Sequence, residues 1–307
     1  MPEVLRGGVI GAGVFGGYHA NQYARLPDVV LSAVLDTHPE RAAGLAMPLG
    51  GRGFTDMAEF LDAVDVVTVA SPASFHAEHA LAALAAGRHV YIEKPIATSV
   101  ADGEKVRAAA AAKRLVVACG HQERVSFQAM GLLDIPEQPL LLEALRHGPP
   151  SDRSRDVSAV LDLMVHDLDL ALAICAADPV TAEGEGRLSD DAVWDVARAE
   201  VSFENGFTAI FDVSRQAPAR KRVMRLVYPS GEVEIDFVAR TFRNTTPFAL
   251  NADYAATPAG QDPLGASVEG FLNAVRGFAQ RPVVTAEEAI RALDLALAVE
   301  QALADPG

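Results

Sequence analysis

Residues 9–16 read Val-Ile-Gly-Ala-Gly-Val-Phe-Gly, and this stretch decides the fold of the first part of the chain. Two apolar residues lead into the spacing Gly-x-Gly-x-x-Gly, and a helical pattern follows as far as about Leu26. Gly11 allows a sharp turn, Gly13 lets the backbone approach a pyrophosphate, and Gly16 permits the helix to pack closely. The first turn of such a helix offers unpaired N–H groups to an anion. The stretch therefore predicts a strand, a dinucleotide-binding turn and a helix.

A carboxylate follows the next predicted strand. Residues 29–35 are apolar and end at Asp36, twenty residues after Gly16. A carboxylate at this place accepts hydrogen bonds from ribose hydroxyls and repels a 2′-phosphate. We therefore expect NAD as the cofactor, with NADP as the alternative because Arg41 is near in sequence. The predicted contacts are Gly11, Gly13, Val14, Phe15, Gly16 and Asp36. An ordinary tight turn, with Asp36 as a helix cap, fits the strand–helix context less well.

Strands and helices alternate through the rest of the first 122 residues. Apolar strands are predicted at residues 66–70, 89–93 and 115–119, with helices at residues 57–63, after His76 and at residues 100–113. This alternation is typical of a doubly wound parallel sheet, so residues 1–122 are predicted to form a Rossmann domain. Gly7 and Gly8 occupy places where a strand usually has β-branched residues, and we expect the first strand to be short or to depend on its neighbours.

The pattern changes after residue 122. Strands are predicted at residues 140–145, 196–203, 207–214, 222–228 and 233–238. Asn205-Gly206 is a strong hairpin signal between two of them. Residues 123–307 are therefore predicted to form an α+β domain with a large, mostly antiparallel sheet. Helices cover one face of such a sheet, and the other face is open to a partner, which predicts a homodimer or homotetramer.

The composition narrows the choice of partners and of location. A formal charge of −15 opposes binding to nucleic acid or to an anionic membrane surface. Cys119 and Cys175 are the only cysteines, which suggests no disulfide framework and fits a reducing cytoplasm. No apolar run approaches membrane-spanning length, and the first residues have no signal-peptide pattern. We expect a cytoplasmic protein that acts on a small molecule.

Glu93-Lys94-Pro95 closes the apolar run of residues 90–92, at the carboxyl end of a predicted strand. Ligands of doubly wound sheets bind at this edge. Most basic residues of the chain are arginines, and Lys94 is one of only four lysines. An arginine is too basic to exchange a proton. A lysine there can stabilise a developing alkoxide and take part in proton transfer. An ordinary surface lysine is the alternative, which the strand-end position disfavours.

A second group of candidate residues lies on a predicted apolar helix. Asp162, His166 and Asp169 have the spacing i, i+4 and i+7, so they form one polar stripe. Histidine titrates nearest neutral pH, which makes His166 the leading general base. Asp162 can orient the imidazole or contact a substrate hydroxyl, while Asp169 can hold the helix to its domain. A hydrogen-bonded core histidine is the alternative. No metal is expected, because Asp-x3-His supplies only two ligands.

These motifs, in this order, resemble the Gfo/Idh/MocA family of dehydrogenases. The likeness also covers Ser71-Pro72 with His76, and residues 87–90 before Glu93. It implies that Lys94, His166 and Asp162 assist hydride transfer at a sugar or polyol carbon. It further implies cofactor contacts at Ser71, Pro72, His76, Glu93 and Lys94.

Residues 120–124, 162–167 and 203–206 resemble, more narrowly, dehydrogenases that oxidise the 3-hydroxyl of UDP-N-acetylglucosamine. That likeness implies an NAD-dependent enzyme whose nucleotide-sugar substrate contacts Lys94, His121, Arg124, Asp162 and His166. Residues 125–127 read Val-Ser-Phe where those relatives usually have Phe-Asn-Pro. The alternatives are a free sugar or inositol-type dehydrogenase and a non-catalytic NAD-binding regulator.

A dense basic stretch at residues 220–222 offers a further place for a substrate diphosphate. Guanidinium groups suit phosphate oxygens, although a charged hairpin end is the commoner explanation of such a run. Arg124 is therefore the preferred candidate for that contact.

Overall fold

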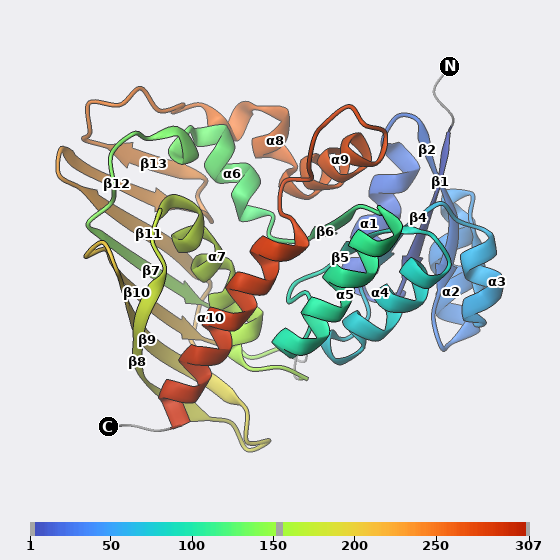
Figure 1. Cartoon of the computed structure of the whole chain (residues 1–307), viewed down its shortest axis with the longest axis horizontal. Helices are drawn as coiled ribbons and strands as arrows, with labels where there is room; N and C mark the ends of the chain where they lie inside the picture. The colour runs from blue at the N-terminus through green and yellow to red at the C-terminus, as the bar shows by residue number, and fades with distance from the viewer. Residues whose placement is uncertain (1–3, 152–155, 305–307) are drawn as a thin grey trace. The chain divides into compact units, whose positions relative to one another are not determined.

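The computed structural model describes residues 4–151 and 156–304, which form two compact units (Figure 1). Unit 1 contains the chain up to Gln122 together with Asp262–Ile290, and unit 2 contains the remainder. The predicted second domain, residues 123–307, thus differs from unit 2 in one segment. Helix α9 (Pro263–Val275) packs on α1 (Val14–Arg25) and β5 (His89–Ile92), so its apolar side chains complete the core of unit 1.

Unit 1 is a six-stranded parallel sheet with the order β3-β2-β1-β4-β5-β6. The remaining strands are β1 (Leu5–Ile10), β2 (Val29–Leu35), β3 (Arg52–Phe54), β4 (Val66–Val69) and β6 (Val117–Cys119). The remaining helices are α2 (Pro39–Ala46), α3 (Met57–Asp62), α4 (His76–Ala85) and α5 (Val100–Lys113), with short turns η1 (Met47–Leu49) and η2 (Ala73–Phe75). This strand order is that of dinucleotide-binding folds, so the predicted doubly wound sheet is confirmed.

The first strand is longer than expected, and its glycines have a packing reason. A Cβ at Gly7 would lie 2.7 Å from the ring of Tyr23, and one at Gly8 would lie 2.5 Å from Val64. The strand nevertheless runs through all six residues, with an irregularity in its pairing to β2 between the two glycines. Of the two expectations, the short strand was wrong and the dependence on neighbours is confirmed, because the missing side chains make room for neighbouring residues and do not end the pairing.

Unit 2 is a seven-stranded sheet with the order β13-β12-β11-β7-β10-β9-β8. Its strands are β7 (Leu141–His147), β8 (Pro179–Leu188), β9 (Trp194–Phe203), β10 (Thr208–Ser214), β11 (Lys221–Tyr228), β12 (Gly231–Asp236) and β13 (Thr241–Asn244). Every neighbouring pair is antiparallel except β7 with β10, which confirms the predicted mostly antiparallel sheet. Gly206 has φ of 83° in the turn between β9 and β10, so the predicted Asn205-Gly206 hairpin is also confirmed.

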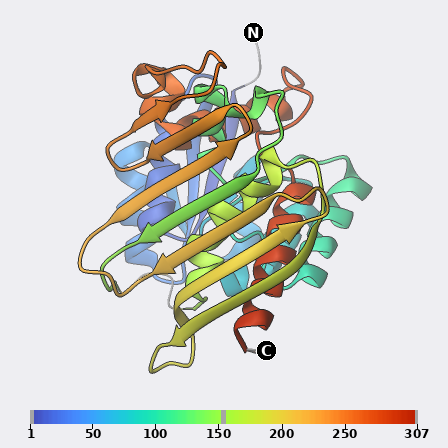
Figure 2. The same cartoon turned by 90° about the vertical axis from the view of Figure 1, so that its left-hand side faces the viewer.

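The two faces of this sheet differ. Helices α6 (Glu123–Met130) and α7 (Val165–Ile174) and the π-helix η4 (Val160–Met164) lie on one face, which we call the covered face. Figure 2 views the sheet from its other side, the open face, where no helix of the unit lies in front of the strands. Alternation along each strand sends neighbouring side chains to opposite faces. Arg146 and Met224 thus lie on the covered face, whereas Glu143 and Arg225 lie on the open face.

The other helical segments of unit 2 are short, apart from the end of the last helix. They are η3 (Leu132–Asp134), η5 (Tyr254–Ala256), α8 (Pro258–Gln261) and the part of α10 (Ala286–Ala304) from Arg291 onward.

Candidate active site

The glycine loop joins β1 to α1 in unit 1. Gly11 has φ of 100°, a left-handed conformation that favours glycine, and a Cβ on Gly16 would lie 1.8 Å from the Gly11 carbonyl oxygen. Gly13 differs, because a Cβ there would meet no heavy atom within 4 Å. Gly13 is the N-cap of α1, and no side chain caps the helix there. The loop thus leaves the first N–H groups of α1 available to an anion.

Asp36 lies against this loop at the end of β2. Its Oδ2 accepts a hydrogen bond of 2.9 Å from the Ala12 N–H group, and its Oδ1 accepts one of 2.9 Å from the His38 N–H group. Burial opposes ionisation, but these N–H donors outweigh it and lower the pKa of Asp36. A charged carboxylate therefore lies beside the turn at neutral pH. Together with the exposed side chains of Val14 and Phe15, this arrangement fits the ribose and pyrophosphate of NAD.

Glu93 and Lys94 follow β5 and have different environments. Glu93 is buried, its Oε1 lies 2.7 Å from His19 Nε2, and Gln122 Nε2 donates to the same oxygen at 3.2 Å. Burial opposes ionisation of Glu93, but His19 lowers its pKa by hydrogen bonding and charge. Glu93 therefore joins α1 to the end of β5 from inside the unit. Lys94 is partly exposed and precedes a cis peptide bond to Pro95.

His76 is buried and bridges two backbone segments. Its Nδ1 lies 2.7 Å from the Pro95 carbonyl oxygen, and its Nε2 lies 2.9 Å from the Ser71 carbonyl oxygen. The Ser71 hydroxyl lies 2.9 Å from His79 Nδ1, and Pro72 is exposed. The structure thus gives His76 a role in holding the end of β4 to the segment that carries Lys94, while Ser71 and Pro72 lie at the same carboxyl edge of the sheet.

In unit 2, His166 lies on α7 with its Nδ1 2.8 Å from Glu123 Oε2. Glu123 begins α6, and its Oε1 accepts a hydrogen bond of 2.9 Å from Arg146 Nη1. Burial opposes ionisation of Glu123, but the charges of His166 and Arg146 lower its pKa well below the usual value. Arg146 is 2 % exposed and forms two further bonds to the carboxylate of Asp167. The imidazole is thus oriented by a charged carboxylate that is itself fixed by a buried guanidinium.

Sequence reasoning gave the orienting role to Asp162, but the carboxylate of Asp162 pairs with Arg215. Asp162 Oδ2 accepts a hydrogen bond of 3.1 Å from Arg215 Nη2. The helix is wound as a π-helix over Val160–Met164, and the N–H group of Val165 bonds to the Val160 carbonyl oxygen five residues earlier. This wider turn lies between Asp162 and His166, so their side chains do not follow the ideal α-helical stripe. The carboxylate at Nδ1 is Glu123, which the sequence analysis did not name as a site residue.

Arg124 and Asp169 form a separate buried pair. Arg124 donates to both carboxylate oxygens of Asp169, at 2.8 and 2.9 Å, and so joins α6 to α7. The expectation that Asp169 holds its helix to the domain is therefore met by this geometry. Arg124 was expected to bind a diphosphate, but its guanidinium forms the bidentate bond with Asp169. His121, another expected substrate contact, is 1 % exposed at the end of β6, and its contact with a substrate stays a prediction.

These groups define what each unit can do chemically. Unit 1 offers a helix start without a side-chain cap, a charged carboxylate beside it and an amine at the carboxyl edge of the sheet. Unit 2 offers an imidazole whose Nδ1 faces a carboxylate, and an imidazole is a group that can exchange a proton with a substrate near neutral pH. Within residues 4–151 and 156–304, no cluster of three or more histidine, cysteine or acidic side chains has the arrangement of a metal site. None of the helices in these ranges is long and apolar enough to cross a membrane.

The chain belongs to the Gfo/Idh/MocA family of oxidoreductases. Residues 5–121 match the model of the oxidoreductase family with the NAD-binding Rossmann fold, and residues 143–235 match the family's C-terminal domain. The predicted class of enzyme and the NAD-binding Rossmann domain are thereby confirmed.

Particular relatives extend this comparison. The chain is 35 % identical to the UDP-N-acetylglucosamine 3-dehydrogenase of Acidithiobacillus ferrooxidans, over 91 % of this chain and 90 % of the relative. The solved structure of that enzyme matches with a TM-score of 0.88 at 32 % identity, over 99 % of this chain and 98 % of the other. The myo-inositol 2-dehydrogenase of Thermotoga maritima is 27 % identical over 69 % of each chain. The WlbA dehydrogenase of Bordetella pertussis, solved with NADH and UDP-GlcNAcA, has the same fold, with a TM-score of 0.89 at 19 % identity, over 100 % and 97 % of the two chains.

Proposed function

We propose that this protein oxidises a secondary hydroxyl on the sugar ring of a nucleotide sugar with NAD, and that its substrate is UDP-N-acetylglucosamine, oxidised at C3. The observation that carries the proposal is the imidazole of His166 held by Glu123 in a chain of this oxidoreductase family. The 35 % identity to a UDP-N-acetylglucosamine 3-dehydrogenase supports the choice of substrate.

Each proposed role follows from the chemistry of the side chain. Oxidation of the alcohol to a ketone removes a hydride from carbon and a proton from oxygen, and NAD, when bound, accepts the hydride. Lys94 donates a hydrogen bond to the substrate oxygen, stabilises its developing negative charge and takes part in the transfer of the hydroxyl proton to His166. His166 accepts the proton at Nε2, because Nδ1 faces Glu123. Lys94 belongs to unit 1 and His166 to unit 2, so their action on one substrate is part of the proposal.

Asp162 has a supporting place in the same proposal. Its carboxylate is partly buried and paired with Arg215, at the start of the helix segment that leads to His166. We propose that Asp162 contributes to the shape and the charge of the substrate site. The cytoplasmic location expected from the composition belongs to the proposal as well.

The test is a spectrophotometric comparison of substrates and cofactors. Purified protein is mixed with NAD or NADP and with UDP-N-acetylglucosamine, N-acetylglucosamine or myo-inositol, and formation of the reduced cofactor is followed. We expect turnover with NAD and UDP-N-acetylglucosamine, and a 3-keto product by mass spectrometry after borodeuteride reduction. Turnover of myo-inositol alone would favour the inositol-type alternative, which the Thermotoga maritima relative supports at lower identity. Binding of NAD without turnover of any hydroxylated substrate would favour the regulator.

The charge of Asp36 sets the proposed preference for NAD. Asp36→Asn keeps an oxygen that can accept one of the two N–H bonds but removes the negative charge. We expect the ratio of kcat/KM for NAD to that for NADP to fall about 10- to 100-fold, because repulsion of the 2′-phosphate is lost. Asp56→Asn is the matched control, since Asp56 is the N-cap of α3 and accepts a bond from the Glu59 N–H group. An unchanged ratio in Asp36→Asn would assign cofactor choice to other residues.

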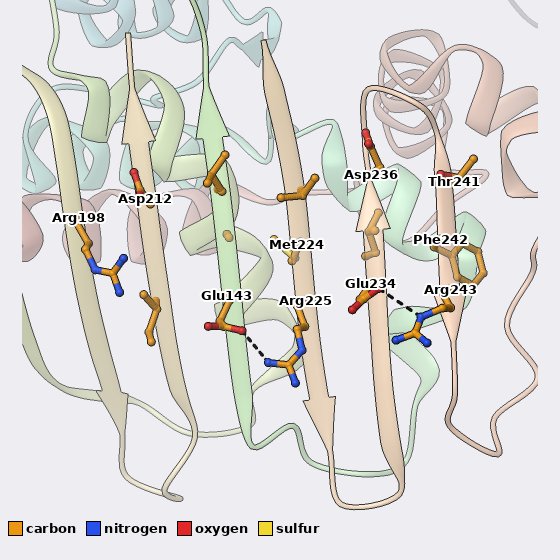
Figure 3. A pocket seen from close by; sticks show the side chains of 15 residues that line it. Glu143, Arg198, Asp212, Met224, Arg225, Glu234, Asp236, Thr241, Phe242 and Arg243 are labelled. Atoms are coloured by element: carbon orange, nitrogen blue, oxygen red, sulfur yellow. Dashed lines mark hydrogen bonds and ion pairs between the residues drawn. The ribbon is translucent and has the colours of Figure 1, made fainter. Parts of the chain in front are cut away.

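The open face of the unit 2 sheet is the proposed interface between copies of the chain. Charged side chains line a hollow of about 610 Å³ on this face. Figure 3 shows several of these side chains with their ion pairs. Arg225 pairs with Glu143 and Glu232 at 2.8 Å each, and Arg243 pairs with Glu232 and Glu234 at 2.9 and 3.3 Å. A face with alternating charges can complement a second copy of itself across a two-fold axis, which supports a homodimer or homotetramer.

Charge reversal tests this interface. Arg225→Glu would gather several carboxylates at the centre of the face, and we expect the mass from light scattering at micromolar concentration to fall to that of a monomer. Arg107→Glu is the control, because Arg107 also forms an exposed ion pair but lies on α5 of unit 1. A monomeric mass for the unchanged protein would contradict the proposal at once.

A further inference from the structure

Arg222 lies beside the buried network of His166, on the covered face of the sheet. The register of β11 with β7 places Arg222 opposite Arg146, whose guanidinium contacts Glu123 and Asp167. Alternation along β11 puts Arg222 on the same face as the buried Met224. The electrostatic neighbours of Arg222 are Arg146, Glu123 and Asp167, which agrees with this placement.

The nearby carboxylates already have partners. Asp167 accepts two bonds from Arg146, and Glu123 contacts both Arg146 and His166. The guanidinium of Arg222, in contrast, makes no hydrogen bond or ion pair with any residue in the part of the chain that the structure describes. Burial and then repulsion by Arg146 lower the pKa of Arg222 to about 10, so the group remains charged at neutral pH at an energetic cost. An anion at this place would relieve that cost.

We propose that Arg222 binds a phosphate group of the substrate next to His166. The inference rests on the proposed function and names the part of the nucleotide sugar that this unit recognises. A guanidinium presents its N–H groups as a planar fork, which matches two oxygens of a phosphate. Arg222 thereby takes the role that sequence reasoning gave to Arg124, whose fork is occupied by Asp169.

The strand itself offers a matched control. Lys221 precedes Arg222 and points to the opposite, open face, where its side chain is exposed. Replacing Lys221 or Arg222 by a neutral residue changes the net charge of the protein by the same amount. Only the replacement of Arg222 changes the covered face. Arg222→Met and Lys221→Met keep unbranched side chains of similar length. Arg222→Lys keeps the charge without the fork.

The direct measurement is the affinity for UDP by isothermal titration calorimetry in the presence of NAD. We expect Arg222→Met to raise the Kd for UDP about 10- to 100-fold, Arg222→Lys to give an intermediate loss, and Lys221→Met to bind like the unchanged protein. With UDP-N-acetylglucosamine as substrate, the loss should appear mainly in KM. The Kd for NAD should be unaffected in all three variants.

Several outcomes would overturn the inference. Equal affinity for UDP in Arg222→Met and the unchanged protein would do so, and so would an equal loss in Lys221→Met. Should Arg222→Met fail to fold, normal UDP affinity in the folded Arg222→Lys variant, with no intermediate loss, would count against it. Failure of the proposed function gives a different pattern: UDP binding depends on Arg222, yet UDP-N-acetylglucosamine is not oxidised.

Discussion

Replacing Lys94 by methionine is expected to lower kcat about 10²- to 10⁴-fold. Methionine keeps an unbranched side chain but cannot donate a hydrogen bond to the substrate oxygen. Loss of a donor that stabilises developing negative charge, combined with loss of a proton-transfer group, has an effect of this size. The KM for NAD should change by less than about threefold, because the glycine loop and Asp36 hold the cofactor in the proposal.

Lys94→Arg separates the two roles of the amine. Arginine keeps a positive charge at the substrate oxygen but remains protonated, so it can stabilise the alkoxide without exchanging a proton. We expect kcat of this variant to lie between those of the unchanged protein and Lys94→Met. Substrate deuterated at the reacting carbon should show a larger isotope effect on kcat in both variants, because hydride transfer becomes rate-limiting.

Lys105→Met is the control for these variants, since Lys105 is an exposed lysine on α5 paired with Asp102. Full dehydrogenase activity in Lys94→Met would remove Lys94 from the mechanism, and the non-catalytic NAD-binding regulator would then become the better explanation of the chain.

Local rules made the nucleotide-binding part of the fold predictable. The glycine spacing, the apolar strands and the carboxylate after β2 depend on residues close in sequence, and the structure has each of them in the expected element. The segment Asp262–Ile290 was not predictable in the same way. Its return to unit 1 depends on packing of α9 against α1 and β5, more than 170 residues earlier in the chain.

Three edge strands, β8, β3 and β13, escaped prediction because they carry little apolar alternation. β8 contains two glycines and two glutamates among its ten residues and is largely exposed at the edge of its sheet. Its pairing to β9 supplies the stability that its own side chains do not. The three-residue β3 and the four-residue β13, also edge strands, are too short for a periodic signal.

The contacts of His166 could not be predicted from residue spacing alone. The i, i+4 rule linked Asp162 to His166, but a π-helix between them alters the geometry, and the contact at Nδ1 comes from Glu123, 43 residues before His166. The sequence contains one usable signal, which is a glutamate in the strand-end motif Gly-His-Gln-Glu-Arg after β6. Acidic residues after strand ends therefore merit testing as partners for a distant catalytic histidine.

Glu123→Gln is expected to lower kcat about 10- to 100-fold with little change in the KM for NAD. The carboxylate faces two donors, His166 Nδ1 and Arg146 Nη1, through its two oxygens. A glutamine offers one oxygen and one NH₂ group, so it can accept from one donor only and presents an N–H group to the other. Either the imidazole of His166 is no longer held in its orientation, or Arg146 no longer fixes the side chain that faces the imidazole. We therefore expect kcat to be affected more strongly than substrate binding.

Asp169→Asn is the matched control for that variant. It alters a buried carboxylate on the same helix, paired with Arg124 rather than with His166. Both variants should lower the free energy of unfolding, because each leaves a buried guanidinium with a weaker partner. Only Glu123→Gln should lower kcat per folded molecule by the stated factor, and Glu123→Asp, which keeps the charge, should recover part of it. Equal kcat in Glu123→Gln and Asp169→Asn would show that Glu123 is structural.

The pH dependence of stability gives an independent measurement on Glu123. Its pKa in the folded protein lies well below the ordinary value of 4.5, so the charged carboxylate stabilises the fold at pH values above 4.5. That contribution is lost as the pH falls below 4.5 toward the folded-state pKa, where the unfolded state binds the proton first. Denaturant titrations should therefore show a large stability difference between the unchanged protein and Glu123→Gln at pH 7, and a smaller one at pH 3.5. A difference independent of pH would mean that the carboxylate of Glu123 is not held in its charged form by His166 and Arg146.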